Sequence, residues 1–372
     1  AAIVVTVTQL GYAAGLAFLV PLGDLLENRK LACRTLLITA AALAAAGFSP
    51  DFTLFLLMSV CIGVTSVVVQ ILVPFAAHLA PADQRGTYVG RVMSGLLLGI
   101  LLARSASSVA AAAWGWRSIY LISAVAMLVL SLVLRRMLPE RRPGTAVRYG
   151  ALLGSAVRLV RDEPVLRRRS LSQALMFGAF SCFWTSIAYE LTGAHHLTQL
   201  QIAVFALVGA GGAVAALVAG RLGDRGYGRL GRGVSVVLGV AAMVLAGVGA
   251  GSVILLACAA VLLDLAVQGH QVLSQRDVYA LREESRARLN TVYMTSAFIG
   301  GSIASGVSGW LHDMYGWTGV TVFGAVLPFL AWCVWLYDRH PGAAPADQLV
   351  PAGRDELADR DELADRVPCG GH

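Results

Sequence analysis

Long apolar segments separated by short charged breaks are the feature that most constrains the fold of this chain. Each segment approaches the roughly 20 residues that an α-helix needs to cross a bilayer. A helix satisfies its backbone hydrogen bonds internally, whereas membrane-spanning strands would alternate apolar and polar residues, which these segments do not. Only 14% of the residues are charged, against about 25% in an ordinary globular domain. We therefore predict an all-α membrane protein.

Eleven apolar segments can be separated at the charged breaks. The breaks alternate between arginine-rich stretches and short stretches with little basic charge. Because basic loops stay on the cytoplasmic side, this alternation predicts a multi-pass protein of the cytoplasmic (plasma) membrane, the cell's inner membrane, with a cytoplasmic C-terminus. Residue 1 then lies outside, and we expect a twelfth helix to precede Ala1 in the intact protein. The segments are 2–22, 33–48, 52–79, 91–113, 117–137, 171–191, 199–221, 233–250, 252–275, 289–311 and 317–337.

The charged string "PLGDLLENRK" at residues 21–30 has a counterpart in the second half of the chain. Asp24 lies 200 positions before Asp224 in "GRLGDRGYGR", and nearly the same offset joins Gly99 to Gly300. A repeat of this length predicts two similar halves related by an axis along the membrane normal. The predicted division is an N-terminal half at 1–137, a basic cytoplasmic linker at 138–170, a C-terminal half at 171–340 and a disordered charged tail at 341–372.

The basic charge of the chain is concentrated in the linker. Residues 135–169 hold ten arginines against three acidic residues, so 10 minus 3 gives +7, which equals the formal net charge of the whole chain. We expect this stretch to meet anionic lipid headgroups. Nucleic-acid binding is not expected, because Tyr149 is the one aromatic residue available there for stacking.

Two halves, a basic central loop and a charged motif after the second helix of each half together resemble the major facilitator superfamily of secondary transporters. The superfamily motif Gly-x-Leu-Ala-Asp-Arg-x-Gly-Arg-Arg is similar to the second string, in which Gly220, Leu222, Asp224, Arg225, Gly228 and Arg229 match. The strings "GLLLGILLARSAS" (95–107) and "RLNTVYMT" (288–295) resemble its arabinose-efflux-permease-like branch of sugar and drug exporters. The resemblance implies a two-half helical bundle with eleven transmembrane helices here and twelve in the intact protein.

The charged motifs are candidates for a cytoplasmic gate. The resemblance implies that they latch the two halves together on the inner side in one of two alternative packings. The alternative interpretation is that their charges only set the topology. The gate candidates are Asp24, Arg29, Lys30, Asp224, Arg225 and Arg229.

Ionisable and polar residues inside apolar segments are candidates for the transport path, because such groups are costly in lipid. Asp264 lies midway along its segment and, with Gln268, Gln271 and Gln275, falls on one helical face. We predict that this stripe lines the path of substrate or protons, with Asp264 as a candidate proton carrier. The alternative is that the stripe only makes hydrogen bonds between helices.

Three further residues are assigned to the same path. Arg104 keeps its charge inside its segment and therefore needs a carboxylate such as Asp264 or Glu190, a carbonyl or an anionic ligand. The alternative is that its side chain reaches to the outer surface. Gln70 and Trp184 would offer hydrogen bonds and a stacking face to a sugar or a planar drug. Gly95 and Gly99 have the spacing of close helix packing.

These features predict a secondary active transporter that exports small molecules, sugars or amphipathic drugs, by alternating access and in exchange for protons. A solute uptake symporter and a membrane scaffold or sensor that does not transport are the alternatives. We expect a monomer whose partners are a small-molecule substrate, protons and anionic lipids. The sequence shows no nucleophile with a base, no phosphate loop and no metal-ligand cluster, and its six cysteines are scattered. We therefore predict no enzyme activity, no cofactor and no metal site.

Overall fold

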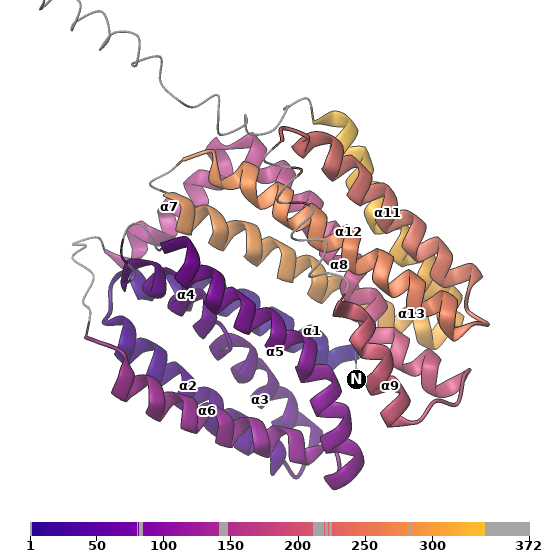
Figure 1. The fold of residues 1–372 in the computed structure, drawn as a ribbon, viewed down its shortest axis with the longest axis horizontal. Helices are drawn as coiled ribbons and strands as arrows, with labels where there is room; N and C mark the ends of the chain where they lie inside the picture. Colours follow the sequence, from indigo (N-terminus) through magenta and orange to yellow (C-terminus); the bar gives the residue numbers. More distant parts are fainter. Residues whose placement is uncertain are drawn as a thin grey trace, which may run out of the picture.

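The structure, a computed structural model, describes residues 2–79, 81, 85–140, 148–210, 219, 222, 225–282 and 285–338. Every regular element in these ranges is a helix, and Figure 1 shows the helices gathered into two bundles. The first bundle contains α1 (Ala2–Ala14), α2 (Asn28–Gly47), α3 (Phe52–Thr65), α4 (Val68–Leu79), α5 (Arg85–Trp114) and α6 (Arg117–Met137). The second contains α8 (Pro164–Gly193), α9 (Gln199–Ala206), α11 (Gly228–Val248), α12 (Val253–Tyr279) and α13 (Arg286–Tyr337).

Eight helical stretches within the described residues are long and apolar enough to cross a membrane, and a ninth is added if the bent pair 94–100 and 105–114 forms one span. Eleven segments were predicted, and two of them are missing even from the count of nine. The segments 289–311 and 317–337 both lie in α13, which runs through a non-helical residue at Gly316. The segment 199–221 is described only as far as α9 and the short helix η3 (Leu207–Ala210), and residues 211–218 lie outside the described part. The helical membrane architecture is confirmed.

The sequence repeat has a counterpart in the backbone. Gly115 and Gly316 hold equivalent places in the two halves, each just before a tryptophan, and their φ angles are +82° and +62°. Positive φ is open to glycine at little steric cost, so it suits a sharp reversal between two long helices. In each half this turn lets the last helix pack beside an earlier one. In the N-terminal half α6 contacts α2. In the C-terminal half the second arm of α13, which follows Gly316 and runs over 317–337, contacts α11.

Glycines allow two pairs of helices to pack closely, α1 with α3 and α8 with α13. A Cβ at Gly11 would lie 2.5 Å from the carbonyl oxygen of Val60, so α1 and α3 could not pack as they do with any larger residue. Gly301 on α13 likewise faces the ring of Phe177 on α8. Gly95 and Gly99 differ, because no atom of the described residues lies within 4 Å of a Cβ added there. Close packing at these two glycines therefore stays a prediction, because it has no counterpart among the described residues.

The linker, predicted as a basic loop, contains the helix α7 (Tyr149–Asp162), and α8 already begins at Pro164. One face of α7 is apolar and packs on the C-terminal half, where Leu159 is buried against Leu166, Val278 and Tyr293. Its arginines, such as Arg158, remain exposed. Burial of this apolar face explains why a stretch with so much charge is helical.

The charged helix ends gather on one side of the molecule, which we call the basic end. There Arg29 pairs with Glu140, Arg282 pairs with Glu163, and the Tyr149 hydroxyl donates a hydrogen bond of 2.8 Å to the Phe18 carbonyl. Phe18 lies in η1 (Gly15–Leu19), a π-helical stretch that continues α1 and is followed by the 3-10 helix η2 (Val20–Asp24). The linker helix therefore contacts the N-terminal half where the first span departs from α-helical geometry.

Candidate functional site

Asp264 is a buried carboxylate in the middle of α12. The residue is 4% exposed, and its Oδ1 accepts a hydrogen bond of 2.9 Å from Nε1 of Trp184 on α8. The indole is held in an aromatic cluster, with ring centroids 5.6 Å from Phe183 and 6.3 Å from Phe205. The free-energy cost of burying a carboxylate is lower when a donor held in a fixed position makes a hydrogen bond to it. The structure thus brings together two of the residues predicted for the path.

The other predicted polar residues are distributed over several helices. Gln271 accepts a long hydrogen bond of 3.5 Å from Gln173 on α8, and Gln275 donates to Asn290 on α13 over 2.8 Å. These contacts have the form of the interhelical hydrogen bonds considered as the alternative for the stripe. Gln268 is half-buried on α12 and Gln70 is half-buried on α4. Arg104 lies on α5, and its side chain is outside the described part of the structure.

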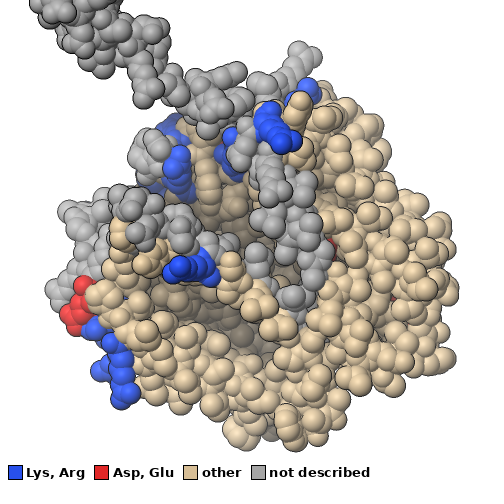
Figure 2. Space-filling view, viewed as in Figure 1, with Lys and Arg blue, Asp and Glu red and all other residues tan. Residues whose placement is uncertain are grey.

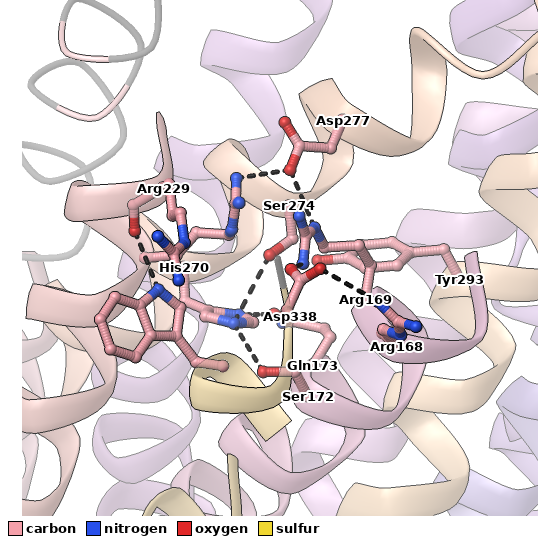
Figure 3. A network of polar contacts seen from close by, with 12 residues as sticks. Arg168, Arg169, Ser172, Gln173, Arg229, His270, Ser274, Asp277, Tyr293 and Asp338 are labelled. Atoms are coloured by element: carbon pink, nitrogen blue, oxygen red, sulfur yellow. Dashed lines mark hydrogen bonds and ion pairs between the residues drawn. The ribbon is translucent and has the colours of Figure 1, made fainter. Parts of the chain in front are cut away.

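A buried histidine lies one to two turns from Asp264 along α12. His270 is 2% exposed, and its Nδ1 lies 2.8 Å from Oε1 of Gln173 while its Nε2 lies 2.9 Å from Oγ of Ser172 (Figure 3). Because an amide oxygen only accepts, Nδ1 carries the proton in this arrangement and Nε2 can accept from the serine hydroxyl. His270 was not predicted from the sequence, although the cost of an ionisable group within an apolar segment applies to it as it does to Asp264.

A buried network of four charged residues closes the basic end of the C-terminal half (Figure 3). Arg169 on α8 donates from Nε to Oδ2 of Asp277 over 2.8 Å and also pairs with Asp338. Arg232 on α11 pairs with the same Oδ2 of Asp277. All four residues are at most 5% exposed, so two positive and two negative charges neutralise one another away from water.

The network is under-satisfied at one member. Nε and Nη2 of Arg232 are buried and find no hydrogen-bond acceptor among the described residues, while Arg168, which is half-exposed, adds a pairing of 3.4 Å to Asp338. Arg169 was counted among the charges of the linker, but it lies within α8, and Arg232 lies within α11. No local pattern distinguishes them from exposed arginines, because their partners lie 45 or more positions away.

Five of the six predicted gate residues fall within the described part of the chain, and they lie at the basic end. Lys30 pairs with Glu27 over 2.7 Å within the N-terminal half, and Arg29 pairs with Glu140 at the start of the linker. The Arg229 guanidinium lies 5.2 Å from the ring centroid of Trp335 in the C-terminal half. Asp24 and Arg225 are exposed, and Asp224 lies outside the described residues.

Contacts between the halves concentrate away from the basic end. Ser302 on α13 donates to the Thr6 carbonyl on α1 over 2.8 Å, and a Cβ at Gly309 would touch Ala2. A second seam joins α5 to α9, where the Ser105 hydroxyl donates to the Ala203 carbonyl over 3.1 Å. Figure 2 shows a hollow between the halves with lysine and arginine side chains along its upper rim. As far as the described residues show, the two halves thus meet at one end and part toward the basic end.

Comparisons with known proteins agree with this architecture. The sequence profile described as Major Facilitator Superfamily matches residues 1–269 and 169–361. The chain is 39% identical over 343 residues to the transporter YgaY of Escherichia coli O157:H7, covering 91% of this chain and 86% of that one. It is 36% identical over 335 residues to the transporter SCO4007 of Streptomyces coelicolor, covering 88% and 76%. The structure of the nucleoside transporter NupG superposes with a TM-score of 0.72 at 15% identity, covering 91% and 90%.

Proposed function

Because this chain belongs to the major facilitator superfamily and is a multi-pass membrane transporter rather than an enzyme, we propose that it exports small organic solutes by alternating access. The proposed substrates are sugars or amphipathic drugs, and the proposed driving force is the proton gradient across the plasma membrane. The observation that carries this proposal is the buried Asp264 carboxylate on α12, which accepts a hydrogen bond from Trp184 on α8, so that a proton-accepting group and an aromatic face meet between two spans.

The proposed orientation places the basic end in the cytoplasm. Positively charged loops favour that side, and α13 ends there beside Asp338, which puts the C-terminal tail inside as well. The arrangement with halves apart at the basic end then corresponds to a cytoplasm-facing state. In the opposite state the gate residues of the two halves would meet across the closed inner side. They are Asp24, Arg29, Lys30, Asp224, Arg225 and Arg229. Each contact would exist in one state only and so bias the equilibrium.

A disulfide that locks the contact between α1 and α13, at the end away from the basic end, should stop transport. A Cβ at Gly306 would lie 3.3 Å from Oγ1 and 3.6 Å from Cγ2 of Thr6, so the pair Thr6→Cys with Gly306→Cys places two sulfur atoms within bonding reach. We expect oxidation to abolish flux and a reducing agent to restore it. Each single cysteine variant serves as the control. Flux that continues through a fully formed disulfide would contradict alternating access about this contact.

Everted membrane vesicles with an acid interior test the export proposal. A pH-sensitive dye reports whether an added compound from a panel of sugars and lipophilic cations discharges the gradient, with vesicles lacking the protein as the control. Discharge by one compound supports proton-coupled export. If no compound discharges the gradient but vesicles of the opposite orientation accumulate a labelled solute with protons, the protein is an uptake symporter. If folded, inserted protein moves no compound in either orientation, a scaffold or sensor replaces the transporter proposal.

A further inference from the structure

A pocket of about 470 Å³ lies on the side of the C-terminal half, between α8 and the two arms of α13. Its walls are almost wholly apolar and include Leu171, Ile299, Ile303, Phe323 and Leu327. Three of these side chains are exposed, with Leu171 at 52%, Ile299 at 42% and Ile303 at 60%. Because α8 and α13 are both long and apolar enough to cross a membrane, this exposed face adjoins the acyl chains of the bilayer.

The pocket differs from the contact surface between the halves. The α13 residues that meet the N-terminal half, such as Ser302 and Gly306, are not among those that line it. Its volume falls within the range of about 300–1,000 Å³ found for small-molecule sites. A molecule bound here would reach the protein from the membrane rather than from the proposed transport path.

Polar groups stand at one end of this apolar pocket. Arg167 lines it, is exposed at the basic end, and donates from Nη1 to the Arg161 carbonyl over 2.8 Å. None of the ion pairs described for the chain includes Arg167, whereas its neighbours Arg168 and Arg169 both pair with Asp338. Its charge is therefore available to an anion.

Ser170 is a second, independent indication of a ligand. The residue lines the pocket and is 6% exposed, and its hydroxyl has no hydrogen-bond partner among the described residues. Buried hydroxyl groups in folded proteins are almost always hydrogen-bonded, because an unmatched one is costly. A phosphate or ester oxygen lying between Arg167 and Ser170 would satisfy both groups.

We propose that this pocket binds an anionic phospholipid of the inner leaflet. One acyl chain occupies the apolar pocket between α8 and α13, and the phosphate accepts from Arg167 and the Ser170 hydroxyl. Arg161, which is exposed on α7 and whose carbonyl accepts from Arg167, adds to the positive potential at the mouth. The proposal gives a defined place to the lipid attraction expected for the linker, and it does not depend on the transport function.

Native mass spectrometry of the purified full chain tests this site with phosphatidylglycerol and phosphatidylcholine of the same acyl chains. We expect phosphatidylglycerol to bind more tightly, and Arg167→Ala to weaken its binding about tenfold, the loss of one charge-assisted hydrogen bond. Phosphatidylcholine carries the same phosphate and should also lose affinity in Arg167→Ala, but it should bind more weakly than phosphatidylglycerol throughout, because its choline cation is repelled by the basic mouth of the pocket. The matched control is Arg158→Ala, which removes an exposed arginine of the same linker away from the pocket lining.

A second variant tests the acyl-chain part of the site. Ile303→Trp should fill the pocket and weaken binding of both lipids, while the thermal midpoint of the variant in detergent checks that it is folded. The proposal is overturned if the two lipids bind equally, since the arginine then selects no headgroup. It is also overturned if Arg167→Ala and Arg158→Ala have the same effect, or if filling the pocket leaves lipid binding intact in the folded variant.

Discussion

Asp277→Asn should lower the free energy of unfolding by about 3–5 kcal/mol, the range for removing one partner of a buried ion pair. Asp277 accepts from Arg169 and pairs with Arg232, and all three residues are at most 5% exposed. The substitution preserves the shape of the side chain but leaves two buried arginines facing the single charge of Asp338. The measurement is the thermal unfolding midpoint in detergent, together with the yield of folded protein.

Restoring neutrality should recover part of this loss. In the double variant Asp277→Asn with Arg232→Gln, Arg169 and Asp338 remain as a balanced pair, so the double variant should unfold at a higher temperature than Asp277→Asn alone. Asp313→Asn is the control, because its side chain is 87% exposed and its loss should have little effect. A double variant no more stable than the single one would show that charge balance does not hold this end together.

Asp264→Asn should reduce proton-coupled transport to the level of vesicles that lack the protein. The amide oxygen can still accept from Trp184, so the local packing is retained, but the side chain can no longer carry a proton. Exchange of labelled for unlabelled substrate across the membrane needs no net proton movement. We therefore expect exchange to continue in this variant while the dye response disappears.

Trp184→Phe provides the complementary measurement. It keeps an aromatic ring in the cluster but removes the donor to Asp264. Loss of a hydrogen bond to a charged acceptor lowers the free energy of unfolding by about 1.5–3 kcal/mol. We expect this variant to retain coupling but to unfold at a lower temperature than the parent chain. Loss of exchange as well as coupling in Asp264→Asn would contradict the role of a proton carrier, and would assign Asp264 to substrate binding or to folding.

Local patterns predicted the spans well where apolar residues run without interruption. The runs around α2, α6, α11 and α12 were each identified within several residues. The helix α7 was missed because the analysis weighed the total charge of the linker rather than the apolar face that packs Leu159. The pairing of Asp264 with Trp184 was not predicted, although both residues were selected, since the contact joins positions 80 apart in the chain.

The order of residues alone predicts that this chain is helical, lies in a membrane and has two similar halves. Those properties follow from hydropathy over about 20 residues and from a fixed offset, which need no knowledge of contacts. Which charges are buried became clear only from the three-dimensional structure. Arg169 and Arg232 can leave water because Asp277 and Asp338, distant in the chain, neutralise them, and such compensation depends on how the helices pack rather than on any local pattern.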